Sequence, residues 1–138
     1  MFYFGSTAFT WQSKKQAIVT LSTCEAEYVA ASSCVNHAIW LRYLLEDLKL
    51  EQSGPTEIRV DNKSAIELAK NPVYHERSKH IDVRYHSIRE HIKNEEIRVT
   101  HVPSRDQAAD ILTKALPRTA FEEGKKKFGM IRHRDIED

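Results

Sequence analysis

Three carboxylates in this chain stand where metal chemistry would need them. Asp61 follows a β-prone run at 57–60, and ligands bind at the carboxyl ends of strands in open α/β sheets. Glu27 lies in the first turns of an expected helix, and Asp110 lies in the helix expected after the next strand. Mg²⁺ takes oxygen ligands, and two such ions about 3.5–4 Å apart can activate water and stabilise a leaving oxygen in phosphodiester cleavage. The three acids therefore predict a metal site if they meet at one sheet edge.

Each acid also has a simpler interpretation. Asp61 could be only the N-cap of the helix that follows it. Ser22 or Thr23 can cap the long helix, and Glu25 in its first turn suits the helix dipole. Glu27 is two residues further on and points in another direction, so it can face the sheet edge if Glu25 faces solvent.

The composition limits the classes of protein that the chain could be. With 138 residues, of which 41% are hydrophobic, it suits one domain with one core. No apolar run is long enough to span a membrane, and the start, MFYFGSTAF, lacks the basic region of a signal peptide. Cys24 and Cys34 lie ten residues apart on one expected helix, which favours a reduced intracellular protein of the cytoplasm or nucleus. The net charge of +1 excludes a strongly basic packaging protein, but a local patch could still bind nucleic acid.

Hydrophobic periodicity predicts strands alternating with helices. A hairpin-like pair of strands is expected over 2–11 and 17–21, and a helix over 23–48. The apolar stripe of that helix would consist of Ala30, Cys34, Ala38, Leu41, Leu45 and Leu48. Further on we expect a strand at 57–60, a helix at 64–69, a helix carrying Ile81, Tyr85, Ile88 and Ile92, a strand at 97–102, a short helix at 107–114 and a last helix after Pro117. This order predicts an α/β fold in which the strands at 57–61 and 97–102 pair in parallel.

Basic residues and histidines gather before and within the second long helix. They are His75, Arg77, Lys79, His80, Arg84 and Arg89. A phosphate track beside the site and a solvated helix face both explain them, and both stay open. The candidate substrate-binding residues are Asn62, Ser64, Arg77, Lys79 and Arg84, with Gln107 as a further donor to 2′-hydroxyls. A zinc site at His75 and His80 is not favoured, because no CxxC accompanies them.

Three blocks of the sequence together resemble the ribonuclease H region of copia-type LTR retrotransposon polyproteins. They are SKKQAIVTLSTCEAEYVAAS, IRVDNKSAIELAKNPVYHERSKHIDVRYHSIRE and VPSRDQAADILTKAL. The resemblance covers about residues 4–117, with a C-terminal helix and tail over 118–138. It implies a single ribonuclease H-like domain, a five-stranded mixed sheet flanked by helices. It also implies two Mg²⁺ (or Mn²⁺) ions held by four carboxylates, and the RNA strand of an RNA–DNA hybrid as substrate.

The resemblance assigns a role to individual residues. The Glu of the AEY motif matches Glu27, the Asp of VDN matches Asp61 and the Asp of QxAD matches Asp110, so these three are the expected catalytic metal ligands. Glu25 is not one of them. His101 lies near where related nucleases carry a mobile histidine that assists product release.

The fourth carboxylate of the family lies on a first strand, in a segment like SDADWA that precedes a stretch such as MFYFGSTAF. No Asp or Glu occurs before Glu25, so we expect this chain to lack the first strand and first ligand, and its hydrolysis to be weak or absent. That strand is central in the family, and unpaired backbone groups beside the gap would cost about 1–3 kcal/mol each if buried.

Three ways to resolve that gap stay open. The chain could be part of a longer polyprotein, a partner could add a strand, or the sheet could be rearranged with 128–134 as filler. Self-association through the open sheet edge is a further expectation. The alternative function is a non-catalytic module that binds nucleic acid or a protein.

Overall fold

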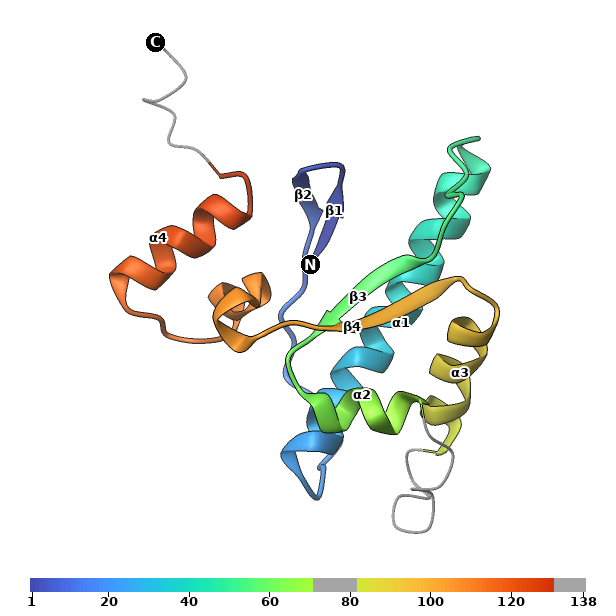
Figure 1. The fold of residues 1–138 in the computed structure, drawn as a ribbon, viewed down its shortest axis with the longest axis horizontal. Coiled ribbons are helices and arrows are strands. Elements are labelled where there is room, and N and C mark those ends of the chain that lie inside the picture. The colour runs from blue at the N-terminus through green and yellow to red at the C-terminus, as the bar shows by residue number, and fades with distance from the viewer. Residues whose placement is uncertain (71–81, 131–138) are drawn as a thin grey trace. The chain divides into compact units, whose positions relative to one another are not determined.

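The chain forms two compact units, one of residues 1–15 and 104–138 and one of residues 16–103. The computed structural model describes the backbone of residues 1–70 and 82–130, and side chains throughout these ranges except at 82–86 (Figure 1). No helix in these described ranges is both long enough and apolar enough to cross a bilayer.

The larger unit combines a parallel pair of strands with three helices. Its elements are α1 (Thr23–Asp47), β3 (Thr56–Val60), α2 (Lys63–Lys70), α3 (Asp82–Lys93) and β4 (Ile97–His101). Ile58 pairs with Val99 and Val60 pairs with His101. The predicted parallel pairing of the strands at 57–61 and 97–102 is confirmed. The helices predicted over 23–48 and 64–69 agree with α1 and α2 to within about two residues at each end, and the predicted second long helix is α3.

Residues of the two strands alternate between an apolar and a polar face. Ile58, Val60, Ile97 and Val99 are buried. On the other face the Glu57 carboxylate accepts hydrogen bonds from Arg59 Nε at 3.0 Å and from Thr100 Oγ1 at 2.9 Å. A period of two is what a strand with one apolar face requires, so the sequence of each strand sets which face turns to the core.

The buried face of α1 differs from the predicted stripe. Ala38 and Leu41 are buried as expected, but Ala30 is exposed and Cys34 is only half-buried. The buried face runs through Tyr28, Val29, Ser32, Val35, Ala38, Ile39 and Leu41. Tyr28, Val35 and Ile39 carry more apolar area than Ala30 and Cys34, so turning the helix by about one residue buries more apolar surface.

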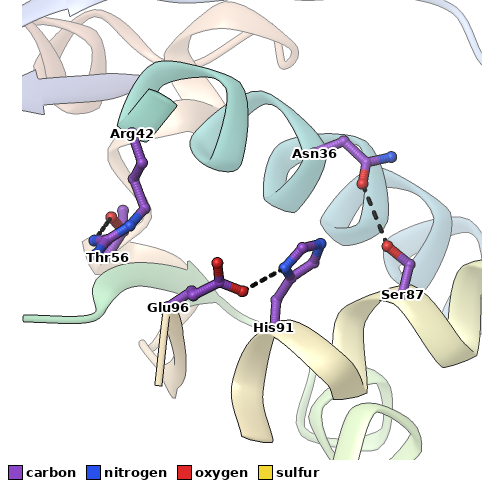
Figure 2. Close-up of polar contacts among 6 residues, drawn as sticks. All are labelled: Asn36, Arg42, Thr56, Ser87, His91 and Glu96. Carbon is purple, nitrogen blue, oxygen red and sulfur yellow. Dashed lines mark hydrogen bonds and ion pairs between the residues drawn. The ribbon is translucent and has the colours of Figure 1, made fainter. Parts of the chain in front are cut away.

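Polar contacts hold α1 against its neighbours in the larger unit (Figure 2). The Arg42 guanidinium donates to Thr56 Oγ1 at 3.1 Å, to the Gly54 carbonyl at 2.7 Å and to the Gln52 carbonyl at 3.2 Å. Ser87 of α3 donates to Asn36 Oδ1 at 3.5 Å. Near the C-terminal end of α3, His91 Nδ1 lies 2.7 Å from Glu96 Oε2. Arg42 therefore fixes the loop that leads into β3.

The smaller unit contains an N-terminal hairpin and the C-terminal helices. β1 (Phe2–Phe4) and β2 (Thr7–Thr10) pair antiparallel. They are followed, after the larger unit, by the 3₁₀ turns η3 (Ser104–Asp106) and η4 (Ala108–Leu112) and by α4 (Arg118–Lys127). The Tyr3 hydroxyl donates to the Lys127 carbonyl at 2.9 Å. The expected last helix is confirmed, whereas the expected helix at 107–114 is a 3₁₀ turn that ends at Leu112.

The strand expected at 17–21 is wrong, because these residues form bends and irregular backbone. Val19 and Leu21 are 88% and 77% exposed. A β-prone run becomes a strand only where a neighbour satisfies its backbone groups, and among the described residues β1 and β2 pair with each other alone. The filler strand at 128–134 is also not formed where the structure describes it, since Phe128 ends α4. Residues 131–134 lie outside the described ranges.

Candidate metal-binding site

The parallel register places the carboxyl ends of β3 and β4 side by side. Val60 pairs with His101, and the Val102 N–H donates to the Val60 carbonyl at 3.0 Å. Asp61 therefore begins the turn at the edge where β4 also ends, with its side chain half-buried. His101 is exposed at the same edge. The sheet thus brings together two residues for which we expected functional roles.

Asn62, rather than Asp61, caps the helix after this turn. Asn62 Oδ1 accepts a hydrogen bond from the Ala65 N–H at 3.2 Å, and its carbonyl accepts one from the Ile66 N–H at 3.2 Å. The simpler interpretation of Asp61 as the N-cap of α2 is therefore wrong. The cap uses the amide oxygen of Asn62, so its expected contact with a 2′-hydroxyl would have to come from the amide nitrogen. Ser64 is exposed in the first turn of α2.

Glu25 has a structural role at the start of α1. Ser22 Oγ accepts from the Glu25 N–H at 3.1 Å, and Glu25 Oε2 accepts from the Leu21 N–H at 2.7 Å. This exchange is close to a capping box, in which an N-cap hydroxyl and a glutamate three residues later satisfy backbone donors at the helix start. The predicted Ser22 cap is confirmed, and Glu25 belongs to the helix start as expected.

Glu27 lies at the end of α1 that is nearest to the candidate site. Arg42 contacts Thr56 at the start of β3, whereas Ala31 lines a small apolar space with Val60 at the strand's end. α1 therefore runs antiparallel to β3. Glu27 comes four residues before Ala31, about one turn or 6 Å further along the helix and on the same face. The half-buried Glu27 is thus on the side of the unit where Asp61 begins its turn.

Asp110 belongs to the smaller unit, in η4. Its carboxylate accepts a hydrogen bond from Lys114 Nζ at 2.8 Å, and its side chain is 19% exposed. With Gln107, Ile111 and Glu123 it lines an open cavity of about 100 Å³. The Lys114 contact was not predicted from the sequence, although the spacing of four residues between an acid and a lysine indicates such a pair.

Within the described residues, no group of three or more His, Cys, Asp or Glu side chains is placed to hold a metal ion. Glu27 and Asp61 lie in one unit and Asp110 in the other, so the meeting of all three stays a prediction.

Burial raises the pKa of both free thiols, Cys24 and Cys34. Of the expected substrate-binding residues, Arg77 and Lys79 lie outside the described ranges together with His75 and His80, and nothing is described of the Arg84 side chain.

Comparison with known proteins identifies relatives over nearly the whole chain. It is 46% identical over 130 residues to the retrovirus-related Pol polyprotein from transposon TNT 1-94 of Nicotiana tabacum, covering 94% of this chain and 10% of that relative. It is 42% identical over 130 residues to the corresponding polyproteins from transposons RE2 and RE1 of Arabidopsis thaliana, covering 94% of this chain and 9% of each. No family model and no solved structure matches the chain.

These relatives establish the origin of the chain. It is homologous to one segment of retrotransposon Pol polyproteins and spans about a tenth of the length of the curated relatives it matches. The predicted resemblance to a retrotransposon polyprotein is confirmed at that level.

Proposed function

We propose that this chain is a ribonuclease H-like domain of retroelement origin. In its intact form the domain would hydrolyse the RNA strand of RNA–DNA hybrids with two Mg²⁺ or Mn²⁺ ions. The observation that carries the proposal is the position of Asp61 at the carboxyl edge of the parallel β3–β4 pair, with the Glu27 end of α1 on the same side. A Pol polyprotein origin is consistent with this activity, because copying RNA into DNA produces such hybrids.

The side chains at this edge suit a hard cation. Carboxylate oxygens are the ligands that Mg²⁺ prefers, and Asn62 rather than Asp61 caps the helix that follows. Bound ions would supply Lewis acidity and a nucleophile at neutral pH. Glu27, Asp61 and Asp110 would hold the ions, and the exposed His101 would take part in product release. The family site has four carboxylates, and three of them match residues of this chain. We therefore propose that hydrolysis by this chain alone is impaired.

The first experiment measures cleavage of a labelled RNA–DNA hybrid in Mg²⁺ or Mn²⁺. We expect weak turnover that is lost in Asp61→Asn. We expect at least a 100-fold gain when the chain is extended by its natural upstream residues, if those encode a strand ending in Asp. Robust turnover by the chain alone would refute the proposed impairment.

A second experiment follows Mn²⁺ binding directly, which remains informative if turnover is weak. Glu27→Gln and Glu25→Gln make the same chemical change two residues apart on α1. We expect Glu27→Gln to weaken Mn²⁺ binding about 10-fold or more, and Glu25→Gln to leave it unchanged because that carboxylate serves the helix start. Equal effects of the two substitutions would contradict the role assigned to Glu27.

The alternative is a non-catalytic module that binds nucleic acid. The group of basic residues before and within the second long helix, which suits contacts with phosphate, is the feature that favours it. Hybrid binding that depends on salt and survives loss of all three acids would support it. Cleavage that requires Asp61 would exclude it.

A further inference from the structure

The C-terminal half of α1, together with its C-cap residue Leu48, presents a second apolar surface, separate from the one buried in the core. Trp40, Tyr43 and Leu48 are 58%, 56% and 60% exposed, and Leu44 is 40% exposed. We call these four residues the α1 stripe. Trp40, Leu44 and Leu48 follow one another at intervals of four, so they form a continuous ridge along the helix. Figure 1 shows these turns of α1 extending away from α2.

The α1 stripe does not belong to the apolar core of its unit. The core face of the helix passes through Val35, Ala38 and Ile39, whereas Trp40 makes an edge contact with the His37 ring at a centroid distance of 5.8 Å. Single exposed apolar residues are ordinary, but a contiguous set with two aromatic rings marks an interaction site. This ridge would lose unfavourable contact with water if another apolar surface covered it.

We propose that the α1 stripe is a self-association surface, through which two copies of this chain pair by antiparallel α1 helices about a two-fold axis at Leu44. A two-fold axis pairs residues whose numbers are symmetric about 44, so each Trp40 meets Leu48 of the other copy and the two Leu44 side chains meet. Ridges spaced by four residues pack against each other in the commonest helix–helix arrangement.

The acidic end of α1 favours an antiparallel over a parallel arrangement of two copies. The last turn of α1 contains Glu46 and Asp47 and no basic residue, although a helix C-terminus favours positive charge. The antiparallel two-fold arrangement keeps the acidic ends of the two helices apart. A parallel arrangement would instead set the acidic ends of the two helices side by side.

The available area fits a weak dimer. The four side chains expose on the order of 500 Å² in each copy, and an interface of about 1,000 Å² in total is near the lower limit for a specific complex. We therefore expect a dissociation constant in the micromolar range rather than an obligate dimer.

Sedimentation velocity of the full chain between about 1 and 200 µM tests the proposal. We expect a concentration-dependent monomer–dimer equilibrium in the wild type, and at least a 20-fold weaker one in Leu44→Glu, which buries a charge at the axis. Val19→Glu is the matched control, since it changes an apolar residue that is 88% exposed elsewhere in the same unit, and it should associate like the wild type. Circular dichroism verifies that both variants fold.

A wild type that stays monomeric over the whole concentration range would overturn the proposal. A Leu44→Glu variant that associates as tightly as the wild type would also overturn it, since that result is expected if the copies pair through a sheet edge instead. Leu44→Cys in a background with Cys24→Ser and Cys34→Ser, which removes the two native free thiols, gives an independent test, because a pair centred on residue 44 holds the two introduced sulfurs within bonding distance. We expect this variant to form a disulfide-linked dimer under mild oxidation and Val19→Cys in the same background not to do so. Equal cross-linking of the two would also contradict the two-fold at Leu44.

Discussion

The side chain of Asn62 caps α2 by accepting a hydrogen bond from the backbone N–H of Ala65 at 3.2 Å. Asp61, the preceding residue, is therefore not required to start the helix. Of the two residues that follow β3, Asn62 caps the helix and Asp61 is the proposed metal ligand. This division allows stability and metal chemistry to be tested separately.

Asn62→Ala should lower the free energy of unfolding by about 1 kcal/mol, because the Ala65 N–H loses its partner. Asn62→Ser should retain most of the stability, since serine is also a good N-cap. Asp61→Asn keeps the size of the side chain and leaves the Asn62 cap in place, so we expect a smaller loss of unfolding free energy than in Asn62→Ala, while metal-dependent cleavage is abolished. Urea denaturation measures all three. A loss in Asp61→Asn as large as in Asn62→Ala would show that Asp61 supports the turn after all.

The start of α1 should depend on Ser22 in the same way. Ser22→Ala removes the acceptor of the Glu25 N–H and should cost about 1 kcal/mol of unfolding free energy. Thr23→Ala is the control, because the neighbouring threonine was an equally good cap candidate by sequence and lies inside the helix. We expect Thr23→Ala to cost less than about 0.5 kcal/mol. A larger loss of unfolding free energy in Thr23→Ala than in Ser22→Ala would show that Thr23 is the cap.

Arg42 should set the stability of the loop that enters β3. Arg42→Met keeps much of the aliphatic stem but removes the donors to Gln52, Gly54 and Thr56, so we expect a loss of about 1–3 kcal/mol. Arg98→Met, at an exposed position of β4, is the control and should be nearly neutral. Amide hydrogen exchange should accelerate within residues 52–56 in Arg42→Met. Unchanged exchange there would show that the loop holds without this side chain.

The contact between Lys114 and Asp110 should oppose metal binding if Asp110 is a ligand. The ammonium already neutralises the carboxylate at 2.8 Å, and an arriving cation has to displace it. Pairs with this exposure are worth about 0.2–1 kcal/mol, so Lys114→Gln should strengthen Mn²⁺ binding by about 1.4- to 5-fold. The same substitution combined with Asp110→Asn should have no such effect. An equal gain in the Asp110→Asn background would mean that Lys114 acts by general charge alone.

Local sequence signals predicted most of the elements. The helix periods, the Ser22 cap and the parallel pairing of β3 with β4 follow from residues close in sequence or from short connections. The strand at 17–21 was wrongly predicted, and the buried face of α1 was predicted only in part. Both depend on which neighbours are available for pairing and packing. A β-branched run such as 17–21 has a strand's composition but forms none without a partner.

The candidate site was predicted less completely than the fold of its elements. The position of Asp61 follows from its place after a strand, and Glu27 could be separated from Glu25 by their spacing. The cap at Asn62 was not predicted because short polar side chains compete for the same backbone groups, and sequence alone does not rank them. The contact of Lys114 with Asp110 was not predicted either, although the spacing of four residues indicates it. The meeting of Glu27, Asp61 and Asp110 depends on contacts between residues more than 30 positions apart, which no local pattern specifies.

The polar face of the β3–β4 pair should make stability depend on pH through Glu57. The hydrogen bond from Thr100, followed by that from Arg59, lowers the pKa of the Glu57 carboxyl below its usual range. A carboxyl whose pKa is lower in the folded state stabilises the fold at pH values above its unfolded pKa, near 4.3, and this stability is lost as the pH falls through the folded pKa. Glu57→Gln should therefore cost about 0.2–1 kcal/mol at neutral pH, a small value because the pair is exposed.

The same difference should shrink as the pH falls through the lowered pKa of the Glu57 carboxyl in the folded state, because the wild-type carboxyl then becomes protonated. Thr100→Val removes the larger cause and should return the Glu57 pKa towards its usual value in an NMR titration. Arg59→Met should return it less, because the guanidinium is the smaller cause. If Glu57→Gln costs as much below the folded-state pKa found in that titration as it does at pH 7, the contribution of Glu57 comes from packing on the strand rather than from its charge.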